Sequence, residues 1–275
     1  MRTHIYNKMT AQEVEDYLAS GRDTVVVAAG PTEIHGESPL DIENAFAQLN
    51  AVTIAEELDA VAVINLPYIY PGGTAIGRGT VWTTELQNYD FAFQFCKSLV
   101  DQGFRKILIV PGHGAFWLPF FIRDFFDQTH IHPVEVHVNA ELPRDNIEGG
   151  VTTMDKFLDA AAMLKIKQQF KNLRIDPNGV QRGEVIANDP ALREFADTVR
   201  PFGGVAALAF MDRRQHGGGY VYKSEEEARE MAEIGMKATE AGVKKADFEG
   251  LLEALDAYQA YAAKVAEKNP VFNGL

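Results

Sequence analysis

Two apolar, β-branched runs, each followed by a glycine-flanked histidine, constrain the fold of this chain more than any other feature. The first run covers residues 24–29 and leads to Glu33 and His35, and the second covers residues 104–110 and leads to His113. Runs of this length and composition are typical of buried strands. In an open α/β sheet, ligands bind among the loops that leave the carboxyl ends of the strands. The sequence therefore predicts that the two histidine loops meet in one crevice.

Glu33 and His35 stand two residues apart, so their side chains point to the same side wherever the extended conformation persists. Two histidines and a carboxylate are enough protein ligands for a catalytic divalent metal with an open coordination position. We therefore predict that Glu33, His35 and His113 bind a metal ion, with zinc or manganese as the first candidates and iron as a further one. The alternative, from these residues alone, is a solvated loop glutamate and a hydrogen-bonded turn histidine.

Strand and helix patterns alternate along the chain. A capping-box pattern at Thr10–Glu13 predicts a first helix that ends near residue 20. Alternation of this kind implies βαβ units and a mostly parallel sheet flanked by helices, which is an α/β fold. We predict a single domain over residues 1–275, with a helical C-terminal extension from about residue 224. The expected strands cover residues 24–29, 61–66, 104–110, 134–138 and 205–210, and the expected further helices cover 42–58, 84–102, 115–128, 225–241 and 244–268.

Composition excludes several classes of partner. The formal net charge of −13 argues against nucleic acid and against an anionic membrane surface, because both attract basic proteins. No apolar run approaches the roughly 20 residues of a membrane span, and the N-terminus lacks a signal-peptide pattern. Cys96 is the only cysteine, which favours a reducing compartment. We predict a cytoplasmic protein that acts on a small molecule.

Four short motifs follow one another along the chain: Glu33-Ile34-His35-Gly36, Gly79-Thr80-Val81, Gly112-His113-Gly114 and the segment Asp145–Met154. In their order and separation they resemble the creatininase (creatinine amidohydrolase) family. The resemblance extends from about residue 8 to about residue 240. It implies a creatininase-like α/β fold, a metal-dependent hydrolase and a ring-like homo-oligomer, a hexamer in the family.

The chain departs from the family pattern at several positions that carry its chemistry. The aspartate that bridges two metal ions in the family falls on Asn44, and a metal-binding glutamate of some members falls on Ala115. The family histidine of the fourth motif falls on Glu148, and its glutamate on Thr153. The histidine before the Gly-Thr block falls on Ile76. With this set of residues altered, creatinine itself is not the expected substrate.

Glu148 takes the proton-transfer position of the family histidine and is our predicted catalytic residue. It can act as a general base or as a metal ligand, and the alternative is a carboxylate that points to solvent. Neighbouring acids can also replace the missing bridging aspartate, because loop register shifts without altering the scaffold. The further candidate site residues are Asp41, Glu43, Asp145 and His216, the last of which follows a predicted strand and precedes three glycines.

The preferred function is metal-dependent hydrolysis of a small polar substrate, at a C–N bond of a cyclic or linear amide. One alternative is a hydrolase that opens a keto-cyclitol or related sugar-derived ring. Another is a degenerate family member that binds a small ligand or serves only in an oligomer. The aromatic residues of the helix at 115–128 indicate core packing or a subunit interface.

Overall fold

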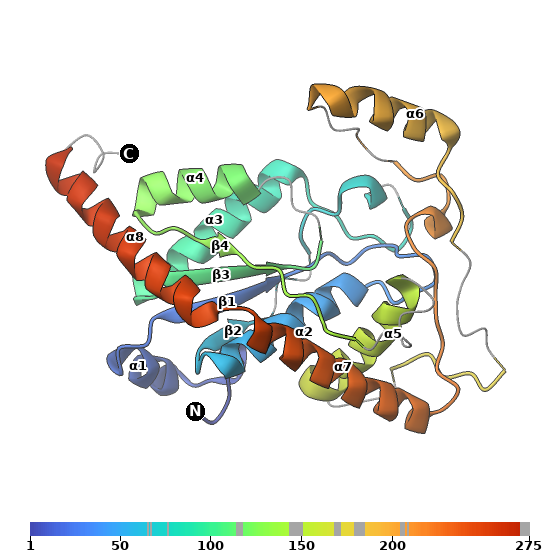
Figure 1. The fold of residues 1–275 in the computed structure, drawn as a ribbon, viewed down its shortest axis with the longest axis horizontal. Helices are drawn as coiled ribbons and strands as arrows, with labels where there is room; N and C mark the ends of the chain where they lie inside the picture. Colours follow the sequence, from blue (N-terminus) through green and yellow to red (C-terminus); the bar gives the residue numbers. More distant parts are fainter. Residues whose placement is uncertain are drawn as a thin grey trace.

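Parallel strands with helices on both faces form the centre of the molecule (Figure 1). The structure is a computed structural model, and it describes residues 1–64, 66, 68–75, 77–113, 118–142, 151–167, 172–178, 185–203, 207 and 209–269. Within these residues the sheet has four strands in the order β2-β1-β3-β4, and every pairing is parallel. The strands are β1 Thr24–Ala29, β2 Val61–Val63, β3 Lys106–Pro111 and β4 Val134–Glu135.

The two faces of the sheet bury alternate residues of the same strands. Val25 and Val27 of β1 pack into one hydrophobic cluster with residues of helices α1 (Ala11–Ala19), α3 (Glu85–Gln102) and α4 (Leu118–Thr129). Val26 and Ala28 pack into a second cluster, mainly against helix α2 (Ile42–Glu57) and the residues around the start of α8 (Phe248–Lys268). Burial on both faces explains why β1 reads as an unbroken apolar run rather than an alternating one. The α/β fold with a mostly parallel sheet between helices is therefore confirmed.

Each predicted helix is present, with ends that differ by a few residues, whereas the helices at Val151–Ala162 and Pro190–Val199 were not predicted. The capping box at Thr10 is present, because the Thr10 hydroxyl accepts from the Glu13 amide and the Glu13 carboxylate accepts from the Thr10 amide. No described helix has both the length and the apolar character that crossing a membrane requires. The helices are α1 Ala11–Ala19, α2 Ile42–Glu57, α3 Glu85–Gln102, α4 Leu118–Thr129, α5 Val151–Ala162, α6 Pro190–Val199, α7 Glu225–Lys245 and α8 Phe248–Lys268, with 3-10 turns η1 Tyr6–Lys8, η2 Gly72–Thr74, η5 Arg200–Phe202 and η6 Arg213–Gln215 and a π-helical turn η4 Met163–Lys167.

The predicted strand at residues 205–210 is wrong for the part of it that the structure describes. Ala207, Ala209 and Phe210 belong to no strand, and the ring of Phe210 lies 5.1 Å from that of His216. A short apolar run can line a site as well as pair in a sheet, and its periodicity does not distinguish the two. The other strands lie where they were predicted, although β2 and β4 are shorter.

Candidate metal centre

Two loops that bear the predicted ligands leave the same edge of the sheet. In the parallel register, Ala29 of β1 lies opposite Pro111 of β3, so the residues that follow these two positions emerge side by side. The Gly112 amide donates to the Ala29 carbonyl at 2.8 Å and fixes the second loop against the first. A Cβ on Gly112 would lie 2.1 Å from the Glu43 carbonyl oxygen, so only glycine permits this approach to the start of α2. His113 is thereby brought to the first turn of α2.

Glu33 is the most deeply buried member of the cluster, with 1 % of its surface exposed. The Thr74 hydroxyl of η2 donates to Glu33 Oε2. Glu33 Oε1 lies 3.1 Å from His216 Nε2 and 3.4 Å from His113 Nδ1. Burial by itself would raise the pKa of Glu33. The opposing effects are stronger and lower this pKa: they are hydrogen bonds from His216, the Glu43 carboxyl and Thr74, and the nearby charge of His113. An ionised, fixed carboxylate is suited to hold a cation.

Glu43, in the first turn of α2, lies between the two predicted histidines. Its Oε2 is 3.0 Å from His113 Nδ1, and its Oε1 is 3.9 Å from His35 Nε2. Burial, with the adjacent Glu33 carboxylate, raises the pKa of Glu43 to about 7, although the His113 hydrogen bond opposes this shift. Burial also opposes the charge on His113, but the Glu43 carboxylate overcomes it and raises the pKa of His113. Two acids this close repel each other, and a cation between them would relieve the repulsion.

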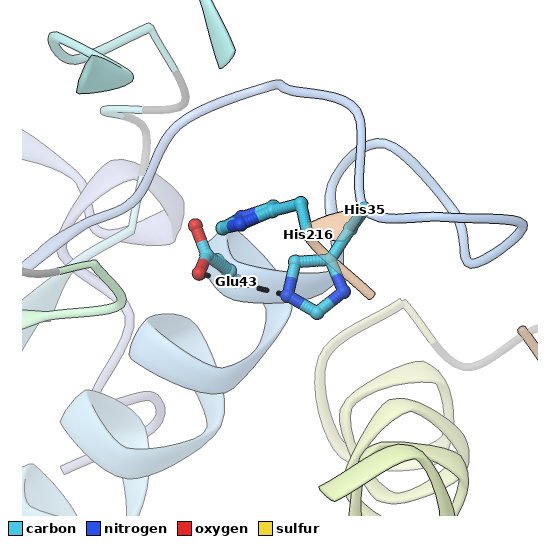
Figure 2. Close-up of side chains that lie close together, drawn as sticks. All are labelled: His35, Glu43 and His216. Atoms are coloured by element: carbon cyan, nitrogen blue, oxygen red, sulfur yellow. Dashed lines mark ion pairs between the residues drawn. The ribbon is translucent and has the colours of Figure 1, made fainter. Parts of the chain in front are cut away.

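The rings of His35 and His216 pack against each other beside Glu43, with centroids 4.6 Å apart and planes at 71° (Figure 2). Burial, with the nearby His216, lowers the pKa of His35 to about 4. The imidazole of His35 is therefore neutral at pH 7 and keeps a lone pair for a metal. Its Nδ1 atom is buried and has no hydrogen-bond partner.

Two sets of three donors therefore share Glu43. One set is Glu33, Glu43 and His113, and the other is His35, Glu43 and His216. Within each set the candidate ligand atoms all lie within 4.8 Å of one another. Nitrogen and oxygen donors of this kind suit zinc, manganese or iron. The chemistry of this donor set, with His35 Nε2 facing Glu43, fits a bound divalent metal.

The structure brings together most of the residues that the sequence singled out. Glu33, His35 and His113 share one cluster, which Glu43 and His216 join. Asp41 immediately precedes α2 but belongs to neither donor set. Asp145 and Glu148 lie outside the described residues, so the catalytic role of Glu148 stays a prediction.

Sequence reasoning missed two residues near the centre. Thr74 of η2 belongs to none of the sequence motifs, and it donates a hydrogen bond to Glu33. Asp155 of α5 is buried, and the nearby charge of Glu43 contributes to a raised pKa. No local pattern marks Asp155, because its position in α5 reads as an ordinary helical residue.

Comparison with known proteins identifies the family. A sequence model of the creatininase family, described as creatinine amidohydrolase, matches residues 7–172, which is more than half of the chain. The chain belongs to the creatininase family. A search of curated proteins found no match.

Solved creatininase structures share the fold. A tryptophan-to-alanine mutant creatininase matches at a TM-score of 0.55 and 15 % identity, over 88 % of this chain and 98 % of the other. A glutamate-to-glutamine mutant of the Zn-Zn type matches at 0.56 and 13 %, over the same shares. A protein from Bacteroides fragilis NCTC 9343, described as a putative creatinine amidohydrolase, matches at a TM-score of 0.53 and 16 % identity, over 94 % of this chain and 96 % of the other. At this sequence identity, the comparison supports the creatininase fold. The chemistry has to be inferred from the side chains of this chain.

The family match does not cover every member of the cluster. Four of the five donors lie within residues 7–172 of this creatininase-family chain, whereas His216 lies well beyond them. The matched range therefore includes Glu33, Glu43 and His113, and His216 joins the cluster from a later part of the chain.

Proposed function

We propose that this chain is a metal-dependent hydrolase that cleaves a C–N amide bond in a small polar substrate, cyclic or linear. Family membership supports a hydrolase of the creatininase type. The observation that carries the proposal is the Glu43 carboxylate, which lies in contact distance of both histidine loops and belongs to two donor sets. The degenerate alternative depended on the loss of a bridging acid at Asn44. Glu43, one residue earlier, supplies a carboxylate at that place.

Each donor has a defined part in the proposed chemistry. Glu33 is ionised and held by Thr74, so its carboxylate is fixed before a cation binds. His35 stays neutral at pH 7 and offers a nitrogen lone pair. A divalent metal held by these side chains and by Glu43 and His113 would polarise the substrate carbonyl and lower the pKa of a water molecule.

Proton transfer to the leaving nitrogen requires a further group. We propose Glu148 for this step, because it occupies the position of the family histidine in the fourth motif. With a pKa raised toward the working pH by desolvation, this carboxylate would take a proton from the attacking water as general base and then donate it to the leaving nitrogen.

Zinc and manganese are the proposed metals, since imidazole and carboxylate together accept both. The Zn-Zn creatininase structure that shares this fold supports zinc. We also propose a cytoplasmic location, because the single cysteine is buried and unpaired, as in proteins of reducing compartments.

The proposal is tested by the variant Glu43→Gln, assayed on a panel of small cyclic and linear amides. We expect the wild-type protein to hydrolyse at least one of them, to lose this activity on chelation and to regain it with zinc or manganese. Glu43→Gln removes the shared charge and should lose the metal-stimulated rate. Glu57→Gln, at the exposed far end of the same helix, is the matched control. A rate that survives chelation, or a full rate in Glu43→Gln, would contradict the proposal.

A further inference from the structure

We propose that His216, from the loop after η6, is a metal ligand that completes a second cation position with His35 and Glu43. This inference rests on the proposed function, because it concerns the same metal centre. It adds a ligand from a segment that lies outside the residues matched by the family model.

Convergence of the side chains is the first observation. Figure 2 shows Glu43 on α2 with the two imidazoles beside it, and the dashed line marks the ion pair of Glu43 with His35. The three residues offer ligand atoms within 4.8 Å of one another. The His216 side chain is 18 % exposed, so the ring is largely enclosed, with its Nε2 directed toward the acids. Two imidazoles and one carboxylate form a donor set known from catalytic zinc sites.

A rigid local structure places His216. A capping box closes η6, in which the Asp212 carboxylate accepts from the Arg214 amide at 2.9 Å and Gln215 Oε1 accepts from the Asp212 amide at 3.1 Å. The ring of Phe210 lies 5.1 Å from the His216 ring and supports it. A preorganised ligand loses less conformational freedom on binding a metal than a mobile one.

Close backbone packing joins the His216 segment to the loop of His35. The Glu37 amide donates to the Gly218 carbonyl at 2.7 Å, and the Arg213 guanidinium donates to the Glu37 carboxylate at 2.5 Å. A Cβ on Gly217 would lie 2.6 Å from His35 Nδ1, so a larger residue would displace the ring. Glycine at this position therefore lets both histidines approach Glu43 together.

The competing explanation is structural: His216 hydrogen-bonds Glu33 and only holds the loop in place. The substitution His216→Gln separates the two roles, because glutamine keeps an N–H donor for Glu33 but lacks the imidazole ligand. His137→Gln is the matched control, since the His137 side chain is 63 % exposed and belongs to neither donor set.

Chelator-treated proteins are loaded with Zn²⁺ alone, desalted and measured for zinc per chain, with circular dichroism as the check of folding. We expect His216→Gln to retain one zinc ion fewer per chain than the wild type and His137→Gln to retain the same number. Equal, non-zero zinc in wild type and His216→Gln would overturn this inference and leave the proposed function intact. A wild-type protein that retains no zinc would overturn both.

Hydrogen exchange gives a second readout that needs no variant. Zinc bound by His216 would tie residues 209–222 to the loop of His35, so their amides should exchange more slowly in the zinc-loaded wild-type protein. Exchange in this segment that is unchanged by zinc would overturn the inference.

Discussion

Glu43 illustrates how a buried acid prepares a cation site. Its carboxylate lies beside Glu33 in a largely enclosed cluster, and burial raises its pKa to about 7. The ionised carboxylates of Glu33 and Glu43 repel each other. A cation between them would remove this repulsion and favour the ionised form of both. The cost of burying two acids is therefore offset only when a positive charge joins them.

Glu148 is tested by the near-isosteric change Glu148→Gln. If this residue acts as the general base, the variant should keep its metal and lose roughly 10²–10⁴-fold in turnover. If it acts as a ligand, the variant should lose bound metal instead. Metal content and turnover, measured on the same preparation, distinguish these roles. A variant with full metal and full turnover would show that Glu148 takes no part.

Asp155 predicts how the stability of the metal-free protein depends on pH. Burial, together with the charges of Glu43 and Asp159, raises the pKa of Asp155 to about 7 in the folded state, from an ordinary value of 3.8. Between about pH 4 and pH 7 the unfolded chain loses this proton and the folded chain keeps it, so stability falls as the pH rises. Below this window both states are protonated, and above it the loss is complete.

The substitution Asp155→Asn removes the fall in stability with rising pH, because the asparagine amide does not ionise. The free energy of unfolding of the chelator-treated variant, relative to wild type, should rise between pH 5 and pH 8 by up to about 3 kcal/mol. Urea unfolding at the two pH values measures it, with the exposed Asp16→Asn as the control. A difference between variant and wild type that does not change with pH would contradict the burial of an acid at this position.

At the scale of elements, helix α4 secures the face of the sheet that includes Val25. Phe125 is fully buried. Its ring stacks on that of Phe121, with centroids 5.5 Å apart, and meets that of Phe93 of α3 edge to face at 5.3 Å. The aromatic surplus of this helix, which suggested an interface, is thus largely used for core packing in its described part. The described part of this helix therefore gives the interface expectation no support, and Phe116 and Trp117 lie outside the described residues.

Phe125→Ala should lower the free energy of unfolding by about 3–5 kcal/mol, because it leaves a cavity among aromatic rings. Phe91→Ala, on the exposed side of α3 with 55 % of the residue exposed, is the control and should change stability little. Denaturant unfolding measures both variants. Equal effects of the two substitutions would mean that α4 does not pack as the structure has it.

Strands and helices that are marked by a pattern of neighbouring residues were predictable from the sequence. The metal site, whose residues come together only when the chain folds, was only partly predictable. Strand β1 is confirmed to the residue, because six buried apolar residues between turn signals favour one structure. His113 was placed with Glu33 because both follow parallel strands. Glu43 and His216 were named only as further candidates, since nothing in the sequence brings residue 216 to residue 43. The run at 205–210 was mistaken for a strand, because apolar character alone does not distinguish a segment that pairs in a sheet from one that lines a site.

At the scale of the whole molecule, helix α6 projects from the body that surrounds the sheet (Figure 1). It has no buried residue, and Phe195 and Phe202 of this region are 56 % and 87 % exposed. Exposed apolar residues on a projecting helix are typical of a subunit contact. We therefore propose a homo-oligomer, with the hexamer implied by the resemblance as the first candidate.

Light scattering at micromolar concentration should give a mass of several chains. The double substitution Phe195→Asp and Phe202→Asp should lower that mass, whereas Tyr261→Asp on α8, also exposed, should leave it unchanged. A wild-type monomer at this concentration would contradict the oligomer, and an unaltered mass in the double variant would exclude α6 from the contact.

The central claim is that the cluster around Glu43 binds a catalytic metal, and elemental analysis tests it most directly. Wild-type protein purified without chelator, and its Glu43→Gln and Glu57→Gln variants, should be analysed for zinc, manganese and iron per chain. We predict at least one divalent ion per chain in the wild type and in Glu57→Gln, and its loss in Glu43→Gln, because this substitution removes a donor from both sets. A wild-type protein without metal, or a Glu43→Gln variant with the same metal content as the wild type, would contradict the account.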